Sequence, residues 1–371
     1  MKVLVVSHGF QEHYTIGFAN GLARSGIHVL LVHSRTLDST ALDPAIRSVD
    51  LGQNTGERYS ALHKGARFLK YHVSLLVLAI THFNSNIHVI GLLRHELLTG
   101  VIEGLVFRLL SKRFVLTVHN LLPHDQHTAW NRFLYGVIYR IPHVLIVHTP
   151  KMREELVSQF GIRVDRIQIL EHGLNDAVPD HERTMSQCRE ALGIPQSAFA
   201  LLFFGRIAPY KGLDTLLEAF QMLRSPCHLV VAGAPISATY GAEIRQLIDN
   251  HPSRSAITCV LDWIADKDIA TWFRACDCLV MPYRHIDQSG LVFLSLRFGL
   301  PLISFDVGSV RDYIGEGIGL VVKENTSQAL ANSIDQFRAN SADYSRQAIA
   351  EYSKRFSWEH VIASLAYAYK D

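Results

Sequence analysis

The sequence predicts an α/β protein with two tandem domains, each built on a doubly wound parallel sheet. Short runs rich in Val, Ile and Leu alternate with longer amphipathic stretches along the chain, which is the pattern of βαβ units with buried parallel strands. The length of 371 residues allows two cores at about 150 residues per domain. The stretch HGLNDAVPDHERT (172–184) interrupts the alternation and marks an interdomain linker.

The first domain is expected at 1–176, and five of its apolar runs are expected to be buried strands: 3–7, 28–33, 87–91, 114–119 and 143–148. Helical patterns lie between them, near 14–25, 58–80, 95–111, 127–139 and 150–160. The second domain is expected at 177–355, with strands at 201–205, 228–233, 257–262, 278–282, 301–306 and 318–322. The last segment, 356–371, reads as a helix capped by Ser357.

Composition excludes several classes of protein. Lys and Arg total 36 against 34 for Asp and Glu, so there is no global nucleic-acid signature. The 20 His show no HExxH spacing, which argues against a structural metal site. The five Cys contain no CxxC and indicate free thiols in a reducing compartment. The chain start lacks a signal-peptide pattern, and VSLLVLAI (73–80) is too short to span a bilayer, so we expect a cytoplasmic protein.

The loop after the strand 201–205 is a candidate phosphate clamp. The strand ends at Gly205, Arg206 and Lys211 follow, and Gly212 precedes a helix. Arg can bond two oxygens at once and Lys supplies a point charge, so the pair suits a phosphate. The alternative is that both are ordinary surface cations.

A polar cluster precedes the next helix of interest, which begins at Gly290. Asp287, Gln288 and Ser289 lie before it and Leu291 follows. A helix start carries partial positive charge and unpaired N–H groups, so the main chain here could hold a phosphate while Asp287 accepts from hydroxyls. Alternatively, Ser289 is only an N-cap and Asp287 only complements the helix dipole.

Two positions in the first domain also follow strands. His119 comes after the strand 114–119 and is expected to project into the interdomain cleft, although a lone His is often structural. Gly9 lies in the turn that follows the first strand. That turn contains no GxGxxG, so it gives little support to a nicotinamide or flavin enzyme.

Taken together, the motifs resemble glycosyltransferase family 4, of the two-domain GT-B architecture. The matching stretches are VLTVHN, FFGRIAPYKGLDTLLEAF, LVVAGAP, CDCLVMPYRHIDQSGLVFLSLRFGLPLISFDVGSVRDYI and RFSWEHV. The resemblance covers nearly the whole chain and is strongest from 200 to 325. It implies two Rossmann-like domains facing a cleft, with the last helix crossing back to the first domain.

The resemblance also implies a function. It is the retaining transfer of a hexose-type sugar from a UDP- or GDP-linked donor, without cofactor or metal, in polysaccharide or glycoconjugate assembly. The implied donor site comprises Gly9, Gly205, Arg206, Lys211, Asp287, Gln288, Ser289, Gly290, Leu291 and Ser295. The implied catalytic residues are His119, Asp287, Arg206 and Lys211.

The sequence departs from the family pattern at one place. Members often carry two glutamates spaced E-x7-E, and here Asp287 and Ser295 stand at these positions. Ser295 replaces the acid expected to bind the ribose, and a neutral hydroxyl makes a bond weaker by roughly 1 kcal/mol. Ser295 motivates one alternative function, a non-catalytic nucleotide-sugar-binding relative. A sugar-nucleotide epimerase on the same two-domain plan is the other alternative.

The acceptor is expected on the first domain. The stretches HKGARFLKYH (63–72) and VFRLLSKRF (106–114) mix cations with aromatic and aliphatic residues, as surfaces that contact anionic bilayers do. We expect a saccharide or lipid-linked saccharide acceptor, bound at the inner membrane face. The alternative is that these are ordinary helices with a solvated basic face.

Overall fold

The structure is a computed structural model that describes residues 1–8, 11–33, 37–52, 61–91, 97–122, 128–286 and 288–369. The chain forms two compact units. The first comprises Met1–Gly173 together with Phe356–Asp371, and the second comprises Leu174–Arg355.

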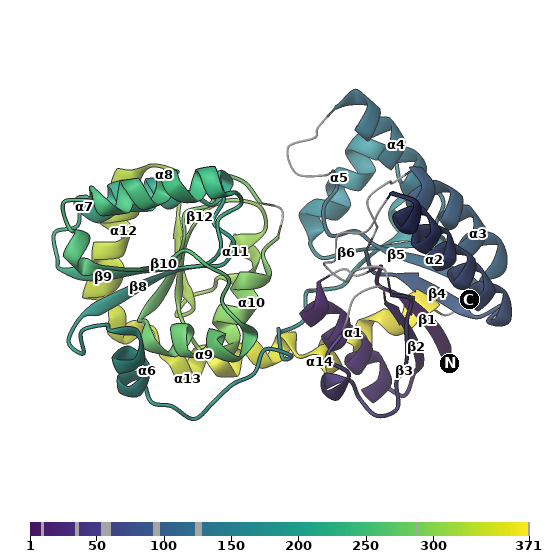
Figure 1. Ribbon diagram of the computed structural model, residues 1–371, viewed down its shortest axis with the longest axis horizontal. Helices are drawn as coiled ribbons and strands as arrows, with labels where there is room; N and C mark the ends of the chain where they lie inside the picture. Colours follow the sequence, from purple (N-terminus) through teal and green to yellow (C-terminus); the bar gives the residue numbers. More distant parts are fainter. Residues whose placement is uncertain are drawn as a thin grey trace. The chain divides into compact units, whose positions relative to one another are not determined.

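The first unit is built on a parallel sheet that has seven strands in the described residues, in the order β3-β2-β1-β4-β5-β6-β7. The strands are β1 (Lys2–Val6), β2 (His28–His33), β3 (Arg47–Asp50), β4 (Asn86–Val89), β5 (Arg113–Thr117), β6 (Val144–Val147) and β7 (Ile167–Ile169). The helices include α1 (Glu12–Arg24), α2 (Ala61–Thr81), the π-helix η2 (Leu97–Ile102), α3 (Glu103–Leu110), α4 (Ala129–Arg140) and α5 (Pro150–Phe160). They lie on both faces of the sheet (Figure 1).

The second unit repeats this plan with six described strands in the order β10-β9-β8-β11-β12-β13, all parallel. The strands are β8 (Phe199–Phe204), β9 (Cys227–Ala232), β10 (Ile257–Val260), β11 (Cys278–Met281), β12 (Leu302–Phe305) and β13 (Gly319–Val322). The helices include α6 (Met185–Leu192), α7 (Leu213–Gln221), α8 (Ala238–Asp249), α9 (Asp266–Ala275), α10 (Gly290–Arg297), α11 (Val310–Tyr313), α12 (Ser327–Ala339) and α13 (Arg346–Ser353). Two parallel sheets covered by helices confirm the predicted fold class.

Two strands were not predicted, and both are short. β3 has the sequence RSVD and is largely exposed, and β7 has only the three residues IQI. Both lie at the edges of the first sheet. An edge strand is covered on fewer sides, so it needs no continuous apolar run and gives a weak sequence signal.

The last described segment packs on the first unit through a tryptophan. Ser357 caps α14 (Trp358–Ala363) by accepting from the His360 N–H, as predicted, and a 3-10 helix η8 (Ser364–Tyr369) replaces the expected continuous helix. Gly17 of α1 lies against the Trp358 indole, because a Cβ there would be 2.0 Å from Nε1. Trp358 is 2% exposed and belongs to the hydrophobic core that includes the buried side chains of α1.

This packing predicts opposite effects for the same substitution at two glycines. Gly17→Ala should lower the free energy of unfolding by about 1–3 kcal/mol, because its methyl group overlaps the Trp358 ring. Gly65→Ala is the control, since Gly65 lies in α2 and a Cβ there would meet nothing within 4 Å. It should raise stability by about 0.5–1 kcal/mol. Denaturant unfolding measures both, and a stabilised Gly17→Ala protein would contradict the described contact.

Candidate functional site

The second sheet reverses its strand order between β8 and β11. Strands β9 and β10 continue from β8 on one side, and β12 and β13 continue from β11 on the other. Open α/β sheets bind ligands beyond the carboxyl ends of the strands at such a point. The loop after β8 (205–212) and the loop after β11 (282–289) meet there, and they contain most of the residues that the sequence assigned to the donor.

Backbone contacts join these two loops. The Arg284 N–H donates to the Tyr210 carbonyl oxygen over 2.8 Å. Gly212 has a φ of 69°, and a Cβ there would lie 2.1 Å from the Pro282 carbonyl oxygen. The left-handed backbone and the close approach both require glycine. The loop that carries the cations and the loop that leads into α10 therefore form one surface.

Lys211 is the buried charge of this surface, with 8% of the residue exposed. The Lys211 Nζ lies 5.3 Å from the centroid of the Tyr283 ring. A Cβ on Gly205 would be 3.1 Å from this Nζ. Burial, and secondly the charge of Arg206, lower the pKa of Lys211 to about 8. Arg206 itself is exposed. The structure thus brings the two predicted cations together, and an anion beside them would offset both burial and repulsion.

The start of α10 faces the same switch point with polar groups. The Ser289 hydroxyl accepts from the Leu291 N–H over 3.3 Å, so Ser289 is an N-cap. The Ser289 hydroxyl therefore does not bind the Gly290 N–H. The Gln288 Nε2 is buried and has no hydrogen-bond partner among the described residues. A ligand oxygen would satisfy that amide, because buried polar groups are almost always hydrogen-bonded.

Ser295 lies deeper in the second unit. It is 0% exposed, and its hydroxyl donates to the Leu300 carbonyl oxygen over 2.7 Å. The side chain therefore ties the end of α10 to the segment that enters β12. In this position Ser295 has no exposed atom that a ribose could contact. The ribose contact expected from the resemblance stays a prediction.

Two residues near the switch point were missed by sequence reasoning. Tyr283 follows β11, and burial raises the pKa of its hydroxyl while a hydrogen bond with Ser289 opposes that rise. Ser309 follows β12, is 3% exposed, and its hydroxyl has no partner among the described residues. Both come just after strands at or next to the switch point. The rule that ligand-binding residues follow strands could have found them.

In the first unit, His119 belongs to a group of imidazoles. Its Nε2 lies 2.9 Å from the Ile90 carbonyl oxygen, and its Nδ1 lies 3.1 Å from the Nε2 of His148. Burial, and then the charges of His148 and His172, hold the pKa of His119 well below its ordinary value. Burial lowers the pKa of His148 to about 4 and that of His172 to about 3. All three rings are therefore neutral at pH 7.

The sequence signal for this group was present but unused. His148 is the first residue after β6, and His172 follows β7 by a few residues. Both pack edge-on against the Tyr14 ring, as His119 does, with ring centroids 4.7 to 5.8 Å apart. Adjacent strands β5, β6 and β7 thus bring three separate His to one place.

His8 follows β1 and was also missed. It has a φ of 49°, which is costly for a residue other than glycine. Its Nε2 lies 2.7 Å from Glu103 Oε1 and its Nδ1 lies 2.5 Å from the Tyr71 hydroxyl. Burial alone would raise the pKa of Glu103, but the charges and hydrogen bonds of His8 and His72 lower it overall. This buried network fixes the backbone at the end of β1.

Two of the predicted site residues, Gly9 and Asp287, lie outside the described residues. In the parts that are described, no group of three or more His, Cys, Asp or Glu side chains has the placement to hold a metal ion.

Two family models match almost consecutive parts of the chain. "Glycosyltransferase Family 4" matches residues 11–178, and "Glycosyl transferases group 1" matches residues 185–356. The first match covers the first sheet except β1, and the second match covers the whole second sheet. Only the chain ends and a short connecting stretch lie outside them.

Curated relatives match over about half of their length. The D-inositol 3-phosphate glycosyltransferase of Streptosporangium roseum is 30% identical over 204 residues, covering 52% of this chain and 46% of the relative. That of Geodermatophilus obscurus is 30% identical over 237 residues, covering 61% and 52%. A Bacillus subtilis protein named for teichuronic acid biosynthesis, TuaC, is 26% identical over 239 residues, covering 60% and 54%. The chain spans about half the length of these relatives.

Solved structures share the fold over the full chain. Sucrose-phosphate synthase of Thermosynechococcus elongatus superposes with a TM-score of 0.78 at 19% identity, covering 100% of this chain and 98% of that one. Anabaena HepE in complex with UDP-glucose superposes with a TM-score of 0.77 at 17% identity, covering 99% and 98%. With both family models matched and this fold shared, the chain belongs to the family 4 glycosyltransferases of GT-B architecture.

Proposed function

We propose that this chain is a retaining glycosyltransferase that moves a hexose-type sugar from a nucleoside diphosphate sugar to a saccharide or lipid-linked saccharide. The observation that carries the proposal is the buried Lys211 ammonium at the switch point, whose charged neighbour is another cation, Arg206. A diphosphate supplies the negative charge that this pair lacks. The name of the relative TuaC supports a role in polysaccharide assembly.

The proposed chemistry follows from where charge develops. Breaking the bond between sugar and diphosphate builds negative charge on the diphosphate and positive charge on the sugar. Lys211, Arg206 and the Gly290 N–H at the start of α10 stabilise the departing diphosphate from fixed positions. Because these groups neutralise the leaving diphosphate, the proposed reaction uses neither a divalent metal nor a cofactor.

Other residues have proposed roles around the sugar. Asp287 accepts from sugar hydroxyls, the Gln288 amide donates to a donor oxygen, and Gly9 lets the phosphates approach the backbone. The departing phosphate helps to deprotonate the acceptor hydroxyl, which places the new bond on the same face as the old one.

His119 is proposed to contact the sugar from the first unit. Its pKa lies well below the ordinary range, so the ring is neutral at pH 7. A neutral imidazole does not repel the positive charge that develops on the sugar, whereas an imidazolium would. The burial that depresses the pKa therefore suits this role.

The donor is proposed to carry UDP or GDP, and UDP-glucose is the first probe because HepE was solved with it. A panel of UDP-, GDP- and ADP-sugars with saccharide and lipid-linked acceptors tests the function. Transfer of the sugar is the expected result. Binding without turnover would favour a non-catalytic relative, which the burial of Ser295 motivates, and a changed donor sugar would favour an epimerase.

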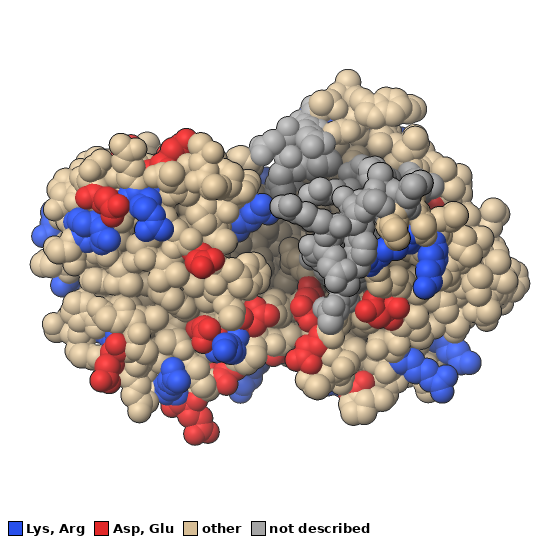
Figure 2. Space-filling model, viewed as in Figure 1, with Lys and Arg blue, Asp and Glu red and all other residues tan. Residues whose placement is uncertain are grey.

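A lipid-linked acceptor is supported by an apolar face on the first unit. This apolar face consists of exposed side chains of α2 and of η2–α3, namely Leu69, Val73, Leu76, Val77, Ile80, Ile102, Leu105 and Leu109. α2 and α3 pack against each other. The cationic stretch 63–72 lies in α2, and the stretch 106–114 runs from α3 into β5. In Figure 2 the surface over α2 and α3 is largely tan, with Lys and Arg at its margin.

The charge of this region has one sign. Glu103 is the one carboxylate among the described residues of 61–122, and it is 8% exposed. Exposed apolar side chains next to cations are the features of proteins that lie on anionic bilayers. Since no helix in the described ranges has the length and hydropathy to cross a bilayer, we propose peripheral contact with the inner face of the cytoplasmic membrane.

Lys211→Gln should weaken binding of UDP-glucose and lower turnover by about 100-fold or more, because it removes the buried charge. Arg206→Gln should have a smaller effect in the same direction. Arg254→Gln is the control, since Arg254 pairs with Asp249 on the surface before β10, at the opposite end of the sheet. Calorimetry and initial rates measure these effects, and near-normal values for Lys211→Gln would remove the clamp.

Donor affinity should fall as the pH rises through about 8, the pKa of Lys211 in the free site. A bound diphosphate favours the ammonium and raises this pKa, so binding above it requires proton uptake and weakens by up to about tenfold per pH unit. Lys211→Arg should flatten this dependence, because Arg stays charged throughout. Calorimetric titration of UDP-glucose between about pH 7 and 9.5 measures it. An unchanged slope in Lys211→Arg would assign the titration to another group.

The membrane contact predicts that the protein sediments with anionic vesicles at low salt and less at high salt. Leu109, which is 78% exposed, should contribute through its apolar side chain, so Leu109→Glu should reduce pelleting. Val164→Glu is the matched control, since Val164 is 59% exposed but lies in another segment of the same unit, before β7. Absence of pelleting at low salt, or equal losses in both variants, would refute the proposed contact.

A further inference from the structure

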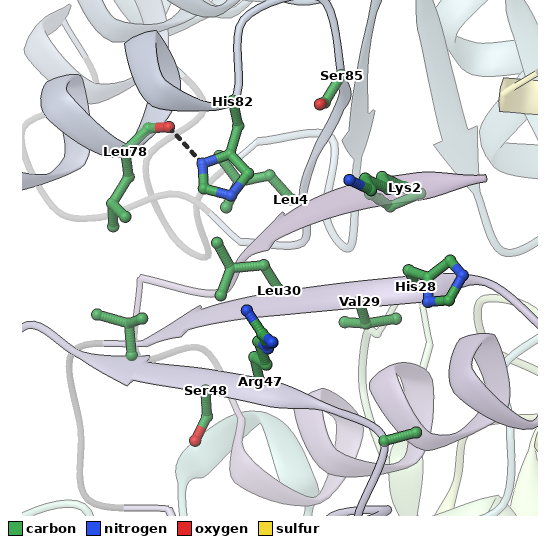
Figure 3. Close-up of a pocket in the computed structure, with 13 residues that line it drawn as sticks. Lys2, Leu4, His28, Val29, Leu30, Arg47, Ser48, Leu78, His82 and Ser85 are labelled. Atoms are coloured by element: carbon green, nitrogen blue, oxygen red, sulfur yellow. Dashed lines mark hydrogen bonds between the residues drawn. The ribbon is translucent and has the colours of Figure 1, made fainter.

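A pocket of about 790 Å³ opens at the amino ends of β1, β2 and β3 in the first unit. Figure 3 shows its lining, with side chains of the sheet on one side and the end of α2 on the other. The loops that follow the strands lie at the opposite end of the sheet, about 16 Å away along a five-residue strand. The pocket is therefore separate from the places at which this fold binds its substrates.

The strand register explains why the sheet side of the pocket is both apolar and cationic. Residues two apart on a strand share a face, so Lys2 and Leu4 of β1 point to the same side. Leu4 pairs with Leu30 of β2, and Leu30 pairs with Arg47 of β3. This alignment places two leucines between two cations on one face of three adjacent strands.

The end of α2 supplies the other wall. Leu78 faces the sheet, and the His82 ring projects from the end of the helix toward Leu30 (Figure 3). The His82 Nδ1 lies 2.9 Å from the Leu78 carbonyl oxygen. That nitrogen therefore carries the hydrogen, and Nε2 is left to face the pocket.

The charges of the pocket are uncompensated. Among the described residues, its lining contains Lys2, Arg47, two His and two Ser but no Asp or Glu. Within the described residues, neither Lys2 nor Arg47 forms an ion pair or a side-chain hydrogen bond. Two cations with free donors above an apolar floor are complementary to a molecule with an anionic head and an apolar tail.

We propose that this pocket binds one anionic phospholipid. Its phosphate lies between Lys2 and Arg47, with His82 beside it, and the first part of an acyl chain lies on Leu4, Leu30 and Leu78. This inference extends the proposed membrane contact to a specific lipid site, and it requires neither donor binding nor glycosyl transfer.

Neighbouring surface favours a lipid over other phosphate compounds. Ile80 and Phe83, which are close to His82 in sequence, are 54% and 66% exposed, so large apolar side chains are exposed near this end of α2. A free phosphate would use the cations but leave the exposed parts of Leu30 and Leu78 in water. A nucleotide would find no Phe, Tyr or Trp on which to stack its base in the part of the lining that the structure describes.

Short-chain lipids test the proposal without a membrane. Dihexanoyl phosphatidylglycerol, kept below its micelle concentration, should bind the full chain saturably with one site, as measured by calorimetry. Dihexanoyl phosphatidylcholine has no net charge, and inorganic phosphate has no chain. Each should bind at least about tenfold more weakly, since each lacks one of the two matched parts.

Variants assign the site. Arg47→Gln and Lys2→Gln should each weaken binding of phosphatidylglycerol by about tenfold. Lys151→Gln is the matched control, because it removes one exposed cation of the same unit on α5 and should leave the affinity unchanged. Thermal unfolding of each variant checks that the fold is intact, which is expected because all three side chains are exposed.

Three results would overturn the inference. Equal binding of phosphatidylcholine would mean that charge is not recognised. Phosphate binding as tight as the lipid would mean a free-anion site. Unchanged affinity in Arg47→Gln and Lys2→Gln would place the lipid elsewhere. None of these outcomes bears on transfer by the second unit, which the sugar-nucleotide panel tests separately.

Discussion

A buried ammonium that has no carboxylate partner in the described part of the chain is the constraint around which the second unit is arranged. Lys211 is held between two loops, over the ring of Tyr283, with Arg206 as its charged neighbour. The start of α10 adds partial positive charge at the same switch point. The Tyr283 ring offsets part of the cost by a cation–π contact, and the nearby carboxylate of Asp214 pairs with Arg284 rather than with Lys211. Gly212 makes the arrangement possible, because another residue would separate the loops. The site is therefore complete only with an anion.

Much of this could be predicted from the sequence, because it depends on local pattern. The buried strands were found from continuous apolar runs, and the Ser289 and Ser357 caps from residue type next to a helix start. The two cations were found because they follow a strand. Tyr283, Ser309 and His148 were missed although each follows a strand, and what the sequence does not show is which of these strands are neighbours in the sheet. Strand order is set by crossover connections and cannot be obtained from the order of elements along the chain.

Ser295 illustrates a different limit. The family pattern places an acid at this position, and its role was transferred to the serine. The structure gives the serine a carbonyl partner at the end of its own helix. A small hydroxyl can satisfy itself against the nearby backbone, whereas a carboxylate of an acid side chain could not be buried there at low cost. The change of residue type thus alters where the side chain finds its partner, in addition to the strength of the bond it can make.

The first unit places neutral and charged basic side chains at opposite ends of its sheet. At the carboxyl ends of its strands, burial keeps His119, His148 and His172 neutral. At the amino ends, Lys2 and Arg47 remain exposed and charged. The packing of Trp358 against Gly17 has its own consequence for biosynthesis. The groove on α1 is filled by residues that are translated after the whole second unit. Domains tend to fold as they emerge from the ribosome, so the second unit can finish folding before α14 is synthesised. Until then, the face of α1 that packs against Trp358 stays uncovered.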